Sequence, residues 1–197
     1  MAAIGFLTTR TGNRFGALIV RPDGITRIPP RAGRQPMMAM LHTLASQERI
    51  DGNGPTDLAA AINTHVMARR RRGLAVVISD FLSPPGWERK LTALAVRHQV
   101  LAVEVVDPRE LELPNVGYLP LVDPETGRRM EVQTAKAALR KRYAEAAAAQ
   151  RAEIATAIRA AGAQHLILRT DRDWLRDVVD HVLTARRRRG VLQRAVR

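Results

Sequence analysis

Two nearly continuous apolar runs constrain the fold of this chain more than any other feature. LAVVISDF occupies residues 74–81, and QVLAVEVVD occupies residues 99–107. Runs of this kind predict strands that are covered on both faces, as in a parallel sheet. A helix is expected between them, at residues 87–98, and the alternation of helix and strand is typical of an α/β sheet.

The segments before the first run predict a hairpin and two helices. A strand at 15–21 should pair with a second one at 25–28, because the Pro-Asp-Gly sequence at 22–24 favours a tight turn. The spacing of apolar residues predicts helices at 34–48 and 57–71.

The segments after the second run predict a second hairpin, two helices and a strand. These elements are expected at 118–122 and 130–134 for the hairpin, 135–161 for a helix, 165–170 for a strand and 173–189 for a helix. Gly162 is the expected C-terminal cap of the long helix, and Thr170 or Asp171 is expected to cap the last one.

Composition excludes several classes of function. The chain has 197 residues and no cysteine, so it has no disulfide, thiol nucleophile or thiolate metal site. It contains neither a nucleophile elbow around a serine nor a glycine-rich phosphate loop, so no enzymatic activity is expected. No apolar stretch approaches the length of a membrane span and the N-terminus does not resemble a signal peptide, so we expect a cytoplasmic protein.

Asp80 is the first candidate for a functional residue, because it ends a buried strand. In open α/β sheets, ligands bind outside the carboxyl ends of the strands. Thr56 lies in the loop before a helix and could point to the same crevice. Carboxylate and hydroxyl oxygens suit a hard cation such as Mg²⁺. The structural alternative is that Thr56 caps its helix and Asp80 merely begins a turn.

The histidines offer no metal-ligand spacing, and each is expected at the surface or at a helix end. They are His42, His65, His98, His165 and His181.

Arginine dominates the basic residues of this chain, whose net charge is +13. The hexapeptide ARRRRG occurs twice, at 68–73 and at 185–190, each time after a predicted helix. Cations are favoured at helix C-termini, so both runs fit solvated helix ends. The alternative is a patch for an acidic protein or nucleic acid. Its residues would be Arg69, Arg70, Arg71, Arg72, Arg186, Arg187, Arg188 and Arg189.

The order of these motifs resembles domain-of-unknown-function family 58, whose core is similar to a von Willebrand factor A domain. The matching stretches are TDLAAAI, RRGLAVVISDFL, HQVLAVEVVDPRELELPNVG, LVDPETGRRMEV and LRTDRDWL. Together they span nearly the whole chain. The resemblance implies a Rossmann-like α/β fold with a mostly parallel sheet flanked by helices.

The resemblance also implies a metal-ion-dependent adhesion site, which is degenerate here. The family pattern combines an Asp-x-Ser-x-Ser loop with a threonine, matched by Thr56, and an aspartate that ends a later strand, matched by Asp80. The Asp-x-Ser-x-Ser loop is absent, so binding of Mg²⁺ or Mn²⁺ is expected to be weak or lost. The first, central strand of the sheet is expected to be missing as well. Residues 1–197 are thus interpreted as a single, truncated domain of low stability that tends to associate.

For function, the resemblance implies a non-enzymatic protein-interaction module that works as an adaptor of a MoxR-type AAA+ ATPase. The alternative, drawn from the arginine runs, is a nucleic-acid-binding protein.

Overall fold

The fold is described from a computed structural model that covers residues 13–47, 56–68, 72–122 and 129–195, with the side chains of 67–68, 121–122 and 185–195 not described. The backbone separates into two compact units. Unit 1 comprises residues 1–71, 83–90 and 118–133, and unit 2 comprises residues 72–82, 91–117 and 134–197. Interpretation of the chain as a single truncated domain stays a prediction.

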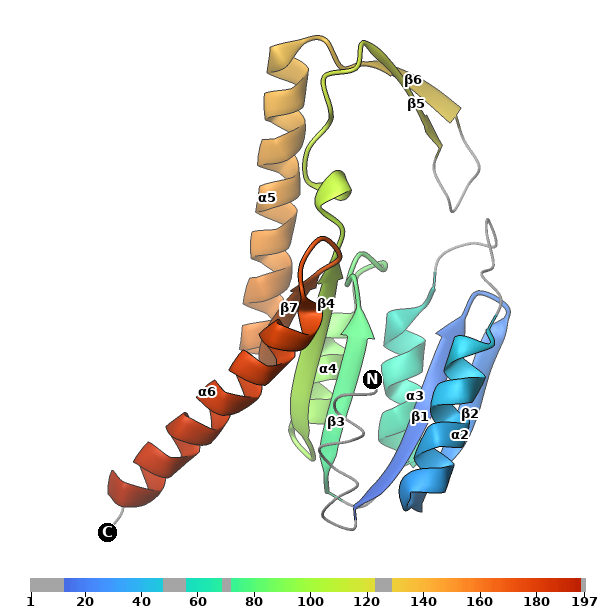
Figure 1. The fold of residues 1–197 in the computed structure, drawn as a ribbon, viewed down its shortest axis with the longest axis vertical. Coiled ribbons are helices and arrows are strands. Elements are labelled where there is room, and N and C mark those ends of the chain that lie inside the picture. The colour runs from blue at the N-terminus through green and yellow to red at the C-terminus, as the bar shows by residue number, and fades with distance from the viewer. Residues whose placement is uncertain (1–12, 48–55, 69–71, 123–128, 196–197) are drawn as a thin grey trace. The chain divides into compact units, whose positions relative to one another are not determined.

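Unit 2 is built on a three-stranded parallel sheet, which confirms the α/β prediction at this level. Its strands are β3 (Leu74–Ser79), β4 (Gln99–Val106) and β7 (Gln164–Arg169), in the order β3-β4-β7. Val103 lies opposite both Ile78 of β3 and Leu166 of β7. The helices α5 (Ala137–Ala160) and α6 (Trp174–Ala195) both pack against β7 (Figure 1).

The core of unit 2 forms where apolar side chains of the sheet meet those of the helices. Ala102 and Val103 of β4 are buried, as are Leu91 of α4 (Trp87–Ala95) and Ile154 and Ile158 of α5. The two isoleucines lie four residues apart, which places them on one face of their helix.

Gly162 ends α5, as the sequence predicts. Its φ of 77° lies in the left-handed region that favours glycine, and its N–H donates to the carbonyl of Arg159 over 2.9 Å. The cap of α6 differs from the prediction. The side chain of Asp173, rather than that of Thr170 or Asp171, accepts from the N–H of Leu175 over 3.1 Å. Asp171 instead pairs with Arg169, at 3.0 Å.

β3 is open to solvent on one face, which corrects the expectation that both faces are covered. Leu74 and Ile78 point to the same face and are 52% and 39% exposed, whereas Ala75 on the other face is 4% exposed. Within the described residues, β3 pairs only with β4, so its second edge carries no strand. The strand that the resemblance places in the centre of the sheet, and expects to be missing here, stays a prediction.

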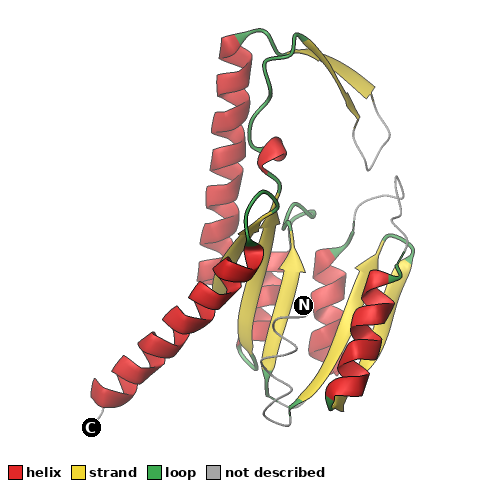
Figure 2. Ribbon diagram, viewed as in Figure 1, coloured by secondary structure: helices red, strands yellow, loops and turns green. Residues whose placement is uncertain are grey.

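Unit 1 contains the predicted N-terminal hairpin of β1 (Arg14–Arg21) and β2 (Gly24–Ala32), which pair antiparallel (Figure 2). Its helices are α2 (Arg34–Ala45) and α3 (Leu58–Ala68). Among the described residues, β1 and β3 belong to separate sheets.

The remaining elements are a hairpin and a short helix. β5 (Tyr118–Val122) and β6 (Arg129–Gln133) form the second predicted hairpin, again antiparallel. A 3-10 helix, η1 (Pro108–Glu110), directly follows β4.

Candidate functional site

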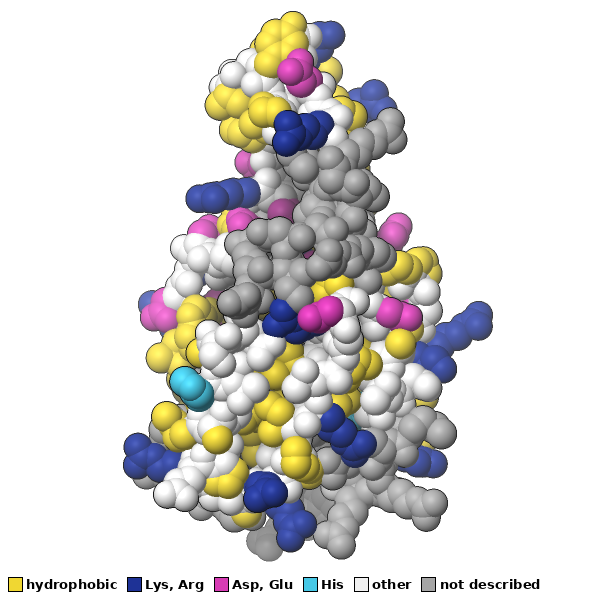
Figure 3. All heavy atoms as spheres, turned by 90° about the vertical axis from the view of Figure 1, so that its right-hand side faces the viewer, with side chains coloured by type: hydrophobic (Ala, Val, Ile, Leu, Met, Phe, Trp, Pro, Cys, Tyr) yellow, Lys and Arg dark blue, Asp and Glu magenta, His cyan; other side chains and the backbone are white. Residues whose placement is uncertain are grey.

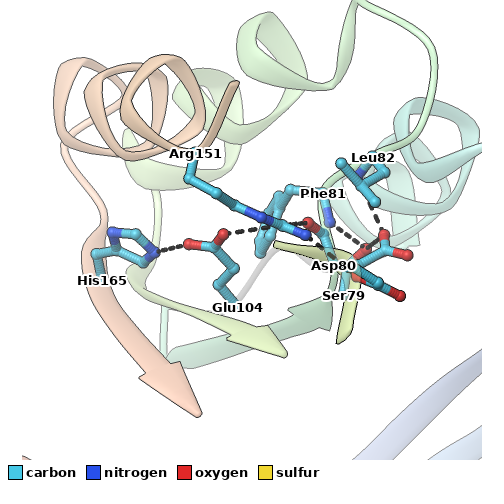
Figure 4. Close-up of polar contacts among 8 residues, drawn as sticks. Ser79, Asp80, Phe81, Leu82, Glu104, Arg151 and His165 are labelled. Atoms are coloured by element: carbon cyan, nitrogen blue, oxygen red, sulfur yellow. Dashed lines mark hydrogen bonds and ion pairs between the residues drawn. The ribbon is translucent and has the colours of Figure 1, made fainter. Parts of the chain in front are cut away.

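Asp80 follows the last residue of β3 and organises the turn that leaves the sheet (Figure 4). Its Oδ1 accepts from the backbone N–H of Leu82 over 3.0 Å and from the Ser79 hydroxyl over 3.3 Å. The same hydroxyl oxygen accepts from the N–H of Phe81 over 3.0 Å. These bonds hold Phe81 in a left-handed conformation, with φ of 59°. The turn role considered for Asp80 is therefore confirmed, and its carboxylate is exposed.

Thr56 lies two residues before α3, and its side chain does not cap that helix. Asp57 does so, since its Oδ1 accepts from the N–H of Ala60 over 2.8 Å. The carbonyl of Thr56 accepts from the Ser83 hydroxyl over 2.9 Å. Within the described residues, the Thr56 hydroxyl makes no hydrogen bond. Thr56 belongs to unit 1 and Asp80 to unit 2, so their pairing stays a prediction.

Beside the Asp80 turn, the buried Glu104 forms a polar cluster with the half-buried Arg151 and His165, which the sequence analysis did not predict (Figure 4). Glu104 of β4 is 1% exposed. Its Oε1 accepts from Arg151 Nη1 over 3.0 Å, and its Oε2 lies 2.7 Å from His165 Nε2. The three side chains come from β4, α5 and β7, so the cluster joins the sheet to the helix that covers it.

Arg151 also links this cluster to the carboxyl ends of the strands. Its Nη1 donates to the carbonyl of Asp80 over 2.9 Å, and its Nη2 lies 3.4 Å from Glu110 Oε2. One guanidinium thus contacts the end of β3, the middle of β4 and η1. The arrangement can fix the position of the Asp80 turn without occupying its carboxylate.

His165 corrects the expectation that every histidine lies at the surface or at a helix end. Its side chain is 11% exposed and sits on β7, with Glu104 as its partner. The sequence does contain one indication of a buried basic partner, which is Glu104. A carboxylate inside an apolar strand such as QVLAVEVV requires a buried partner.

Acidic side chains gather around the Asp80 turn. Burial raises the pKa of Glu110 above its ordinary value, against the lowering effect of Arg151, and the carboxylates of Asp80 and Asp107 raise that pKa further. Asp107 follows β4 as Asp80 follows β3, and its Oδ1 accepts from the N–H of Arg109 over 3.0 Å. The carboxylates of Asp80, Asp107 and Glu110 thus lie at the carboxyl ends of β3 and β4, beside the guanidinium of Arg151.

The described residues alone do not form a complete metal site. Among them, no three histidine or acidic side chains converge closely enough to hold a metal ion. Asp80 and Thr56 each supply an oxygen donor of the kind that Mg²⁺ and Mn²⁺ prefer, and their shared binding of one cation stays a prediction.

The arginine runs lie mostly beyond what the structure describes. Arg69, Arg70 and Arg71 fall outside the described residues, whereas Arg72 is exposed just before β3. Arg186–Arg189 lie within α6, in the part whose side chains are not described. On the face drawn in Figure 3, the described Lys and Arg side chains are scattered. The arginine patch stays a prediction.

A salt titration tests the nucleic-acid alternative. We expect no saturable binding of a 20-base-pair DNA duplex at physiological salt, since both arginine runs follow helices and fit solvated helix ends. Fluorescence anisotropy of a labelled duplex measures this. Saturable binding that weakens by roughly 100-fold between 50 and 200 mM salt, as about four phosphate contacts require, would instead support the arginine runs as an interface.

Comparison with known families decides where the chain belongs. Residues 1–153 match the family described as "Protein of unknown function DUF58". The chain belongs to the DUF58 family. Uncharacterised proteins of Mycobacterium tuberculosis and Mycobacterium bovis are 51% identical to this DUF58 chain over 191 residues, which are 97% of the chain and 59% of each relative. An uncharacterised protein of Mycobacterium avium is 50% identical over 168 residues, 85% of this chain and 98% of that protein.

The DUF58 chain thus spans about three fifths of the length of the first two relatives (59%). Among solved structures, BatB of Bacteroides thetaiotaomicron has a TM-score of 0.43 and 13% identity, over 93% of this chain and 86% of that one. An aerotolerance-related membrane protein of Bacteroides fragilis has a TM-score of 0.41 and 18% identity, over 67% of each chain.

Within the described residues, no helix combines the length and the apolar character that crossing a bilayer requires.

Proposed function

We propose that this DUF58 chain is a non-enzymatic protein-interaction module of the von Willebrand factor A type. Its binding point is the Asp80 turn at the carboxyl end of β3. A weakly held Mg²⁺ or Mn²⁺ bridges Asp80 to a carboxylate of the partner protein, and a MoxR-type AAA+ ATPase is the partner that the resemblance implies.

The proposal rests on the exposure and the hydrogen bonding of the Asp80 carboxylate. The turn uses only one of its oxygens, Oδ1, and the side chain is exposed beside the acidic groups of Glu110 and Asp107. An exposed carboxylate oxygen that the turn does not use is a suitable ligand for a hard cation. Because Arg151 donates to the backbone carbonyl of Asp80 and not to its side chain, the turn is tied to α5 while the carboxylate stays available.

Thr56 supports the same role. Its hydroxyl takes no part in capping α3, a task that Asp57 performs, so the hydroxyl is available as a second oxygen ligand. Two protein ligands leave most of an octahedral shell to water, and we therefore expect weak binding of the cation.

Binding of Mn²⁺ to the full chain, measured by isothermal titration calorimetry, tests the site. Asp80→Asn keeps an oxygen that can accept from Leu82 N–H but removes the charge, so it should weaken Mn²⁺ binding at least tenfold. Asp107→Asn is the matched control, because Asp107 makes the same kind of turn after β4. It should change Mn²⁺ affinity less than threefold. Equal losses in the two variants would mean that the acidic field, and not ligation by Asp80, attracts the ion.

Association with a purified MoxR-type AAA+ ATPase tests the partner. We expect capture of the ATPase by the immobilised chain in millimolar Mg²⁺, and loss of capture with a chelator or with Asp80→Asn. Capture that neither treatment changes would contradict a cation bridge at Asp80.

A further inference from the structure

Arg151 reaches the Asp80 turn from the interior of unit 2. Its Nη1 donates to the carbonyl of Asp80 over 2.9 Å and to Glu104 Oε1 over 3.0 Å. The guanidinium is also held from behind, because Glu104 is 1% exposed and its other oxygen lies 2.7 Å from Nε2 of His165 on β7. All four residues belong to unit 2. The place of the guanidinium is therefore set by the sheet, and not by the exposed turn.

The helix that carries Arg151 is anchored on the same face. Ile154 and Ile158 follow Arg151 by three and seven residues, which places the three side chains on one face of α5. Both isoleucines are buried. Because Arg151 is fixed both by its helix and by Glu104, its hydrogen bond can restrain the peptide unit that follows Asp80.

The other hydrogen bonds of the Asp80 turn lie within the turn itself. They join Asp80 to Leu82 and Ser79, and Ser79 to Phe81. The Phe81 side chain is 2% exposed and holds the turn to the core by packing, which is not directional. The bond from Arg151 is directional, and it acts on the carbonyl next to the Cα that bears the carboxylate. It therefore restrains the orientation of that carboxylate.

We propose that Arg151 is a positioning residue for cation binding at the Asp80 turn, an inference that rests on the function proposed above. A guanidinium has no acceptor atom, so it cannot ligate Mn²⁺. Its charge repels the ion, and by charge alone Mn²⁺ would bind more tightly once Arg151 is removed. Positioning acts in the opposite direction, because a carboxylate on an unrestrained turn loses the orientation that ligation needs. The sign of the change in Mn²⁺ affinity separates the two effects.

A charge-balanced double variant isolates the positional effect. Arg151→Met with Glu104→Gln removes one charge of each sign, and it removes the donor to the Asp80 carbonyl. It also frees Glu110 from Arg151, which would favour the ion, so any weakening is not an effect of charge. Isothermal titration calorimetry of the full chain should show a Mn²⁺ dissociation constant higher by roughly tenfold, as is typical when a group that orients a metal ligand is lost.

Glu104→Gln alone is the matched control for the double variant. The amide oxygen of glutamine can still accept from Arg151, so the donor to the Asp80 carbonyl stays in place. The Mn²⁺ dissociation constant of this variant should change by less than about threefold, since only a charge beside the turn is altered.

Two further variants separate positioning from a general loss of stability. Ile158→Val, on the buried face of α5, should lower the urea midpoint and leave Mn²⁺ affinity within about twofold. Arg151→Lys keeps the charge but lacks the planar fork, and its single ammonium is drawn to the charged Glu104 rather than to the neutral Asp80 carbonyl. It should therefore be more stable than Arg151→Met and still bind Mn²⁺ roughly tenfold more weakly than the natural chain.

Hydrogen exchange gives a readout without metal. The Leu82 amide, which donates to Asp80 Oδ1, should exchange faster in the charge-balanced variant, because the turn opens more often. Unchanged exchange would overturn the positioning role. Equal or tighter Mn²⁺ binding by the charge-balanced variant, beside loss of binding in Asp80→Asn, would overturn the role of Arg151 alone. A natural chain that binds no Mn²⁺ would overturn the proposed function and this inference together.

Discussion

Replacing Arg151 with methionine is expected to lower the free energy of unfolding by about 3–5 kcal/mol, because it leaves a buried carboxylate without its cation. Glu104 is 1% exposed, and the side chain of Arg151 is 17% exposed, so solvent can replace the lost guanidinium only in part. The same change removes the bond from Arg151 to the carbonyl of Asp80. Urea unfolding followed by circular dichroism measures the loss as a lower midpoint.

A matched variant separates this effect from a general loss of helix charge. Arg159→Met changes an exposed arginine of the same helix, whose side chain hydrogen-bonds Thr156 one turn earlier, and it should alter stability by less than about 0.5 kcal/mol. Glu104→Gln added to Arg151→Met should recover part of the loss, because a neutral amide replaces the unpaired charge. Additive losses in the double variant would show that the two side chains are not coupled in the folded chain.

The sheet of unit 2 could be predicted because each strand is encoded locally. The runs that form β3 and β4 are apolar without interruption, and a parallel sheet follows from the helical segment between them. The same inference overstated the burial of β3, where Leu74 and Ile78 remain exposed. An apolar run indicates that a strand is suited to burial on both faces. It does not indicate whether other elements of the chain pack on both faces.

The Glu104 cluster could not be predicted, because its members are far apart in the sequence. Arg151 and His165 follow Glu104 by 47 and 61 residues. Glu104 could be recognised as a charge in need of a partner, but 32 lysines and arginines and five histidines are candidates for that role before the fold is known. Only the register of β4 against β7, and the position of α5 above them, selects these two.

The sequence also does not determine which of several neighbouring residues caps a helix. Thr56 and Asp57 are both good capping residues, and the cap of α3 is Asp57. Likewise, the cap of α6 is Asp173, although Thr170 and Asp171 have suitable side chains. Composition locates a helix start to within a few residues, whereas the backbone geometry decides which oxygen meets the free N–H groups.

Gly16→Ala is the second change for which a large effect is expected. Gly16 sits at an irregularity in the register of β1 against β2, between Phe15 and Ala17. A Cβ there would lie 2.8 Å from the carbonyl oxygen of Ile28 and 2.8 Å from the nitrogen of Pro30. Both are backbone atoms that cannot rotate away, so the hairpin must shift, at a cost of about 1–3 kcal/mol.

Hydrogen exchange shows which part of the chain Gly16→Ala destabilises. Because β1 and β2 belong to unit 1, Gly16→Ala should reduce amide protection in residues 14–32 and leave β3 and β4 of unit 2 protected. Gly73→Ala is the control, since a Cβ at Gly73 meets no atom within 4 Å. It should leave protection unchanged or raise stability by roughly 0.4–1 kcal/mol, because alanine restricts the unfolded chain. Loss of protection throughout both units with Gly16→Ala would mean that the two units unfold as one cooperative structure, which would favour the interpretation of residues 1–197 as a single domain.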